Sequence, residues 1–135
     1  MAHDAADVAQ EDGRLPVGTL VLIVAFTLSG VAHLARPEVF DSLIPPVLGP
    51  PRPWTYASGA AELACATGLA TRQSWAPKAT AGLLSVVWVG NWWMAVAATR
   101  AERRKPALVA LSWARIPLQI PMIRAALRSP VRPRP

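Results

Sequence analysis

The chain is organised around long runs of apolar residues that lack a polar face. Residues 15–35 contain a single ionisable side chain, His33, and residues 79–99 contain no charged residue. About 20 helical residues are needed to cross the ~30 Å hydrocarbon core of a bilayer, whereas a helix on the surface of a soluble protein keeps a polar face. Both runs are therefore predicted to be membrane-spanning helices.

Two further segments have the length of a span but contain a charge. Residues 53–71 are interrupted by Glu62, and residues 106–127 are interrupted by Arg115. Each segment has a proline in its first turn, where the missing N–H does no harm. We interpret both segments as spans, which predicts an all-α fold, an integral membrane four-helix bundle. The alternative is a protein with two spans and additional soluble helices.

The segments outside the spans are short and rich in charge or proline. Residues 1–14 form an acidic tail that we expect to be disordered, and residues 128–135 form a basic, proline-rich tail. A cleaved signal peptide is not expected, because the first run is too long and follows acidic rather than basic residues. Four spans place both tails on one side of the membrane, here called side A, and residues 36–52 on the opposite side, side B.

The side-B loop between the first two spans contains many prolines. Residues 37–44 have the pattern of a short helix with an apolar face, and an extended return is then forced by Pro45, Pro46, Pro50 and Pro51. Such a segment is either a lid lying on the membrane surface or a plain connection. Lysine and arginine are divided almost evenly between the two sides, so the positive-inside rule does not fix the orientation.

Composition supports a membrane protein and narrows its chemistry. Of the 135 residues, 53% are apolar and only 16% are charged, against about 25% charged in an average soluble domain. The single cysteine, Cys65, excludes an internal disulfide and a cysteine-rich zinc or iron–sulfur site, and we expect it to be a packing residue. The net charge is +6, but the tryptophans lie in or beside the spans, as in an interfacial aromatic belt. Lipid is therefore the expected partner, and no nucleic-acid binding is expected.

The two charges inside the spans need a common explanation, because a charge at the middle of a membrane is costly. Glu62 and Arg115 each lie nine residues into spans that run from side B to side A. At about 1.5 Å of rise per residue, both would sit about 13 Å below the side-B surface. Equal depth and opposite sign predict a Glu62–Arg115 ion pair.

Other polar residues fall at similar depths on all four spans. Those between the midplane and side B are His33, Glu62, Asn91, Arg115 and Gln119. Because lipid cannot satisfy such groups, they are predicted to face one cavity that opens toward side B. The alternative is a set of hydrogen bonds that only fix helix packing.

The last span has two further features. Ser112, Arg115 and Gln119 recur at helical spacing, which predicts one polar stripe. Pro117 and Pro121 are predicted to kink the helix and to leave backbone carbonyls without partners. Irregular packing without a function is the alternative for these prolines.

Four motifs then resemble a known family. SGVAHLARPEVFDSLIPPVLGP, SGAAELACATGLA, GNWWMAVAA and ARIPLQIPMI match in order and spacing the DoxX family of small four-helix membrane proteins, over residues 15–127. The positions that match the family pattern are His33, Glu62, Asn91, Arg115, Pro117 and Gln119. The resemblance implies a multi-pass plasma-membrane protein with cytoplasmic termini and an extracytoplasmic proline-rich loop.

The resemblance also suggests a function. DoxX relatives are linked to quinone chemistry, in thiosulfate:quinone oxidoreductase and a terminal quinol oxidase. It implies a redox-associated subunit that binds a quinone-like or other small amphiphile, with Trp88 or Trp92 as a stacking wall. Because the only other histidine is His3, a bis-His haem within the bundle is excluded. Electrons would then come from a partner subunit, or the role would be quinone binding alone. We expect no catalytic residue, no metal site and no independent activity.

Two other functions stay open. One is a non-enzymatic accessory or assembly subunit, acting as a homo-oligomer or with another protein. The other is a small transporter or lipid-handling protein that uses the side-B cavity.

Overall fold

The structure is a computed structural model that describes residues 13–103 and 105–133. The first 12 residues of the predicted acidic tail, Arg104 and the last two residues of the basic tail lie outside the described residues. The helices are α2 (Val17–Ala35), α3 (Pro37–Asp41), a 3-10 turn (Pro46–Leu48), α4 (Pro51–Ala70), α5 (Ala76–Arg100) and α6 (Pro106–Leu127). The described residues contain no strand, which confirms the all-α prediction.

The four long helices coincide closely with the four segments predicted from the apolar runs. Prolines in the first turn mark the starts of α4, α5 and α6, because a proline there fixes a helical φ without removing a needed N–H. The prediction for residues 37–44 also holds in part, since α3 begins at Pro37 but ends at Asp41.

Three of the long helices, α2, α5 and α6, are long and apolar enough to cross a membrane. Their outer faces carry exposed large apolar side chains, for example Val24 and Leu28 on α2 and Val86 and Val89 on α5. Water would penalise such a surface, whereas lipid would not. The fourth helix, α4, is less apolar, because it contains charged residues and many alanines, glycines and threonines.

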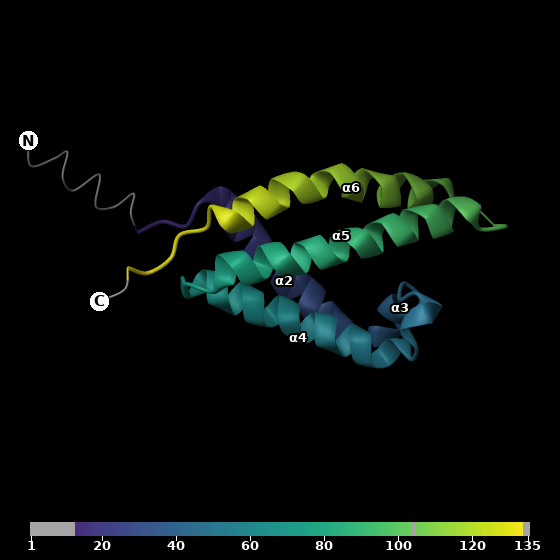
Figure 1. Cartoon of the computed structure of the whole chain (residues 1–135), viewed down its shortest axis with the longest axis horizontal. Coiled ribbons are helices and arrows are strands. Elements are labelled where there is room, and N and C mark those ends of the chain that lie inside the picture. The colour runs from purple at the N-terminus through teal and green to yellow at the C-terminus, as the bar shows by residue number, and fades with distance from the viewer. Residues whose placement is uncertain (1–12, 104, 134–135) are drawn as a thin grey trace, which may run out of the picture.

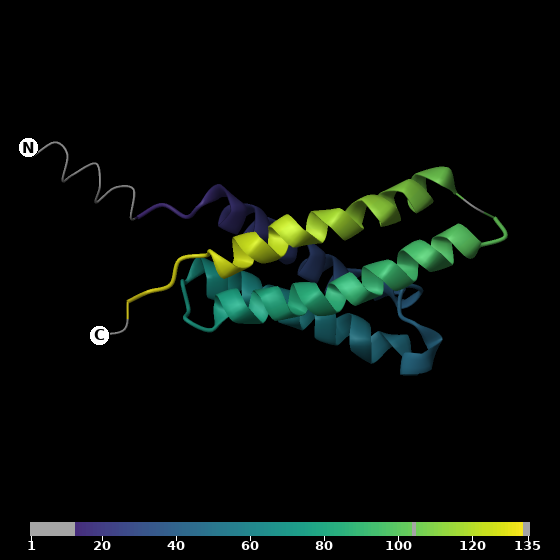
Figure 2. The same ribbon diagram turned by 45° about the horizontal axis from the view of Figure 1, so that its top comes forward.

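The helices form two antiparallel hairpins, α2 with α4 and α5 with α6 (Figure 1). Helices pack closely within each hairpin and much less between hairpins. The hairpins meet at the end that contains the start of α2 and the end of α6, and they diverge toward the α3 end (Figures 1 and 2). The first end corresponds to side A of the sequence analysis, and the α3 end corresponds to side B.

The buried apolar core lies near side A. All four long helices contribute to it, with Leu22 and Phe26 from α2, Leu69 from α4, Leu84 from α5 and Ala126 from α6. Hydrogen bonds between Thr19 and Ser129 (Oγ1 to Oγ, 3.0 Å) and from Arg132 N to Arg72 O (2.9 Å) close this end. Hydrophobic packing therefore joins the two hairpins at side A and leaves their side-B halves less connected.

Two glycines set the distance between α2 and α4. A Cβ on Gly30 would lie 2.8 Å from the Gly59 carbonyl oxygen, and a Cβ on Gly59 would lie 2.8 Å from His33 Cβ. Such distances are too short for a larger residue without movement of a backbone. The two helices consequently touch at Gly30 and Gly59, and this contact brings His33 against α4.

This close contact is testable. Gly59→Ala should destabilise the protein by about 1–3 kcal/mol, because the new methyl overpacks the α2–α4 interface. The matched controls are Gly82→Ala and Gly90→Ala on α5, where an added Cβ meets nothing within 4 Å and alanine should stabilise the helix by up to about 1 kcal/mol. The measurement is thermal unfolding in detergent, followed by circular dichroism. Equal effects at Gly59 and Gly90 would contradict the close approach.

Candidate functional site

His33 and Glu62 form a largely buried polar pair between α2 and α4. The His33 Nδ1 atom lies 3.5 Å from Glu62 Oε2, and the two side chains are 14% and 9% exposed. His33 Nδ1 also lies 2.8 Å from the Ser29 carbonyl oxygen. Because a carbonyl only accepts, Nδ1 carries a hydrogen and donates it to Ser29. Glu62 Oε2 is consequently buried without a hydrogen-bond partner.

The predicted Glu62–Arg115 ion pair is wrong. Arg115 is exposed and forms no ion pair with a described residue, whereas Glu62 Oε2 lies 3.5 Å from His33 Nδ1. The physical reason is that Glu62 and Arg115 belong to different hairpins, which diverge at this depth, whereas the glycine contact brings His33 to Glu62.

A second polar pair lies within the other hairpin. Asn91 Nδ2 donates to Gln119 Oε1 at 3.5 Å, and Gln119 Nε2 donates to the Leu84 carbonyl oxygen at 2.8 Å. Both side chains are buried, so the hydrogen bonds satisfy groups that lipid would leave unpaired. Asn91 and Gln119 therefore fix the packing of α5 against α6, as in the packing alternative of the sequence analysis.

The polar stripe predicted on α6 is divided in the structure. Ser112 and Gln119 are buried, and the Ser112 hydroxyl donates to Leu108 O at 2.7 Å, whereas Arg115 is exposed. Pro117 and Pro121 are also exposed, and α6 continues as one helix through both of them. The two prolines thus interrupt backbone hydrogen bonding without ending the helix.

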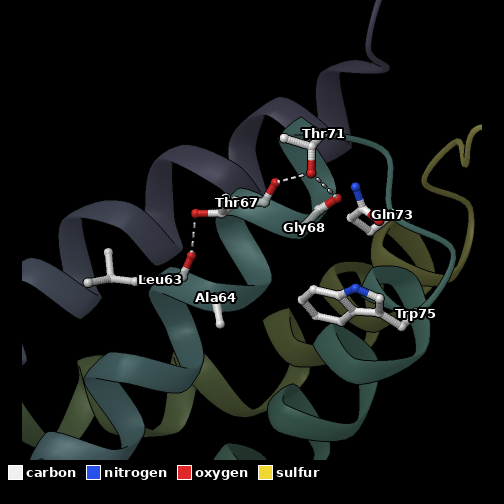
Figure 3. A pocket seen from close by; sticks show the side chains of 7 residues that line it. All are labelled: Leu63, Ala64, Thr67, Gly68, Thr71, Gln73 and Trp75. Atoms are coloured by element: carbon white, nitrogen blue, oxygen red, sulfur yellow. Dashed lines mark hydrogen bonds between the residues drawn. The ribbon is translucent and has the colours of Figure 1, made fainter.

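Four of the five predicted polar residues are therefore brought together in two separate pairs, and Arg115 belongs to neither pair. No hydrogen bond joins the His33–Glu62 pair to the Asn91–Gln119 pair, and Arg115 forms no ion pair with any described residue. A shallow depression of about 530 Å³ lies instead near side A, on α4 and the turn that follows it (Figure 3). Leu63, Thr67, Gln73 and Trp75 are among its lining residues.

Helix α5 contains two buried polar atoms that the sequence analysis did not identify as hydrogen-bonding groups of the site. Trp88 Nε1 and Thr80 Oγ1 are buried and have no hydrogen-bond partner. Trp88 was expected only as a stacking wall, because an indole in an apolar run is indistinguishable from a lipid-facing one without the tertiary packing. Within residues 13–103 and 105–133, no three His, Cys, Asp or Glu side chains gather as a metal site would require.

The short helix α3 adds residues that the sequence analysis did not include in the site. The Phe40 ring stacks on the His33 imidazole, with ring centroids 3.7 Å apart and an interplanar angle of 21°. The Asp41 carboxylate accepts hydrogen bonds from Arg52 and Thr55 on α4. A signal was available in the sequence, because Asp41 and Arg52 have opposite charges and flank the proline-rich loop.

Comparison with known families gives one result. The model of the family described as "Domain of unknown function (DUF8561)" matches residues 22–129, which include both polar pairs, Arg115 and α3. The chain belongs to this DUF8561 family. No curated protein and no solved structure matches the chain. The DUF8561 match does not address the resemblance to DoxX proteins, which stays a hypothesis based on the motifs.

The pairing of Glu62 with His33 can be measured in this DUF8561 protein by double-mutant cycles. His33→Ala and Glu62→Gln should be non-additive in unfolding free energy by about 1 kcal/mol, because the two side chains are in contact. The cycle of Glu62→Gln with Arg115→Gln should be much closer to additive. The measurement is thermal unfolding of the single and double variants. A larger coupling in the Arg115 cycle would show that the sequence-based pair is the correct one.

Proposed function

We propose that this DUF8561 protein binds a small amphiphilic molecule with a hydrogen-bonding head group, of the quinone type, between its two helical hairpins. The observation that supports this most is that Glu62 Oε2 is buried and accepts no hydrogen bond, although it lies 3.5 Å from His33 Nδ1. A buried polar atom that makes no hydrogen bond costs about 1–3 kcal/mol, and a bound hydroxyl or N–H group would remove that cost.

Hydrogen-bonding groups that lack a partner in the structure suit such a head group. Glu62 offers an acceptor, and Trp88 Nε1 is a buried donor without a partner. The exposed Arg115 guanidinium on α6 is a further donor. A hydroquinone hydroxyl would match the acceptor, and a quinone carbonyl would match the donors. An apolar tail would lie against the same lipid-facing helices.

We further propose that α4 is a fourth span and that the protein is a multi-pass plasma-membrane protein with cytoplasmic termini. The packing of α4 along α2 supports this, because a helix held at Gly30 and Gly59 shares the depth of its partner. Its single mid-helix charge, Glu62, faces His33 and not lipid. Any redox role would depend on electrons from a partner subunit of the kind that the DoxX resemblance suggests.

A second candidate function is that of an accessory subunit or homo-oligomer. The observation that favours it is the open outer face of α5, where Gly82 and Gly90 flank Val86 and Val89 and meet nothing within 4 Å. Small residues allow another membrane helix to approach closely. A stoichiometric protein partner in a complex purified without any bound amphiphile would favour this function over ligand binding.

Ligand binding is tested by extraction and by titration. Protein purified in mild detergent should yield a stoichiometric amphiphile on solvent extraction and mass spectrometry, and a short-chain ubiquinone should bind with micromolar affinity. Trp88→Phe, which removes only the N–H, should weaken binding about fivefold through the loss of one hydrogen bond. Trp93→Phe, at an exposed tryptophan of the same helix, is the matched control. No retained amphiphile together with no measurable quinone binding would refute the proposal.

The topology is tested by cysteine labelling in a Cys65→Ala background. Val47→Cys, in the side-B loop, should react with a membrane-impermeant maleimide added to intact cells, and Val131→Cys, after α6, should react only after the membrane is opened. Both parent side chains are exposed, so accessibility reports the side of the membrane. Labelling of both positions in intact cells would contradict the four-span topology, and the reverse pattern would contradict the cytoplasmic termini.

A further inference from the structure

The Asp41 carboxylate fastens the short helix α3 to the start of α4. Its Oδ2 atom accepts a hydrogen bond from Arg52 Nε at 2.8 Å and also lies 2.8 Å from Arg52 Nη2. Its Oδ1 atom accepts a hydrogen bond from Thr55 Oγ1 at 2.8 Å. Thr55 is fully buried, so this second contact is shielded from solvent. One carboxylate thus ties a five-residue helix to two successive turns of α4.

The residue beside Asp41 covers the polar pair. Phe40 stacks on the His33 ring at 3.7 Å, and His33 Nδ1 is 3.5 Å from Glu62 Oε2. The position of Phe40 follows from that of Asp41, because α3 has a single turn and adjacent residues in it move together. The other end of α3 is held by Pro37, which is buried. The Phe40 ring of the side-B loop therefore covers one face of the His33 imidazole.

We propose that Asp41 is a positioning residue that holds Phe40 against His33 and thereby closes the side-B approach to Glu62. Release of Asp41 from Arg52 and Thr55 opens that approach. The proposal rests on the proposed function in one respect: the molecule that would enter by this approach is the proposed amphiphilic ligand. The closure itself concerns the accessibility of His33 and is measured without any ligand, so its failure is distinct from a failure of ligand binding.

The contacts of Asp41 with Arg52 and Thr55 are suited to a segment that opens and closes. The Arg52 side chain is 48% exposed and that of Asp41 is 18% exposed, and solvent-exposed ion pairs contribute little to stability. Farther along the loop, a hydrogen bond from Trp54 Nε1 to Leu48 O at 2.9 Å joins the 3-10 turn to α4. Breaking the Asp41 contacts would free α3 while the core at side A stays intact.

The test measures the reactivity of His33 with diethyl pyrocarbonate, a reagent that modifies accessible imidazoles. The full-length protein in detergent micelles is treated, and modification of the peptide that contains His33 is followed by mass spectrometry. Asp41→Ala should increase the rate about fivefold, mainly through loss of the hydrogen bond from Thr55, because the exposed Arg52 pair contributes little. Asp41→Asn keeps an acceptor for Thr55 and should give a smaller increase. Glu38→Ala removes the other carboxylate of α3, which is exposed, and should leave the rate unchanged.

Two further measurements separate opening from unfolding. Cys65 is buried in the side-A core, so its maleimide labelling rate should stay constant in all variants if only α3 is released. Phe40→Ala removes the covering ring but keeps the Asp41 contacts, and it should also increase the His33 rate. The proposal is overturned if Asp41→Ala and Glu38→Ala behave alike, if Phe40→Ala leaves His33 unreactive, or if Cys65 labelling rises in parallel with His33 modification.

Discussion

The backbone contact between α2 and α4 at Gly30 and Gly59 decides the chemistry of the side-B half of the molecule. Because neither residue has a side chain, the helices approach until the Gly59 position lies against His33 Cβ. This approach places the His33 ring beside the Glu62 carboxylate. It also gives α3 a surface to cover, since Phe40 stacks on the same ring. A larger residue at either glycine would separate all of these groups.

The distribution of packing explains why polar chemistry gathers where it does. Near side A, apolar residues of four helices fill the space between the hairpins. Toward side B the hairpins diverge (Figure 2), and each satisfies its polar groups internally, as Asn91 and Gln119 do. Glu62 Oε2 and Trp88 Nε1 are exceptions, because neither atom has a hydrogen-bond partner. In a low-dielectric setting an unpaired acceptor is costly, and this cost is the physical basis for expecting a bound donor.

The helices were predictable from the sequence with small errors at their ends, because apolar runs and first-turn prolines report local structure. The α6 bounds agree with the predicted span, and the other three long helices differ from their predicted spans by one to three residues at an end. The number of membrane spans was harder to predict from the sequence than the helix bounds. The apolar content of α2, α5 and α6 identifies them as candidates, whereas α4 mixes small and charged residues and depends on its partner helix to cover Glu62.

The sequence predicted which side chains contribute to the candidate site, but it did not predict which of them contact each other. His33, Glu62, Asn91 and Gln119 were selected because a polar group in an apolar run must be satisfied, and each is at least largely buried. The sequence-based depth argument gave Glu62 the wrong partner, Arg115, because depth along the membrane contains no information on which helices are neighbours. Asp41 and Phe40 were not included, because their contacts with Arg52, Thr55 and His33 exist only once the loop has folded back on α4.

The sequence by itself thus determined the helical segments, their apolar outer faces and the residues whose polarity required a partner. These properties depend on residue type and on spacing along one helix, which are local. Only the tertiary structure decided the pairing of His33 with Glu62, the separation of Asn91 and Gln119 into another hairpin, and the covering of the pair by α3. These depend on which helices are neighbours and on how closely they approach, and for α2 and α4 that distance is set by the contact between Gly30 and Gly59.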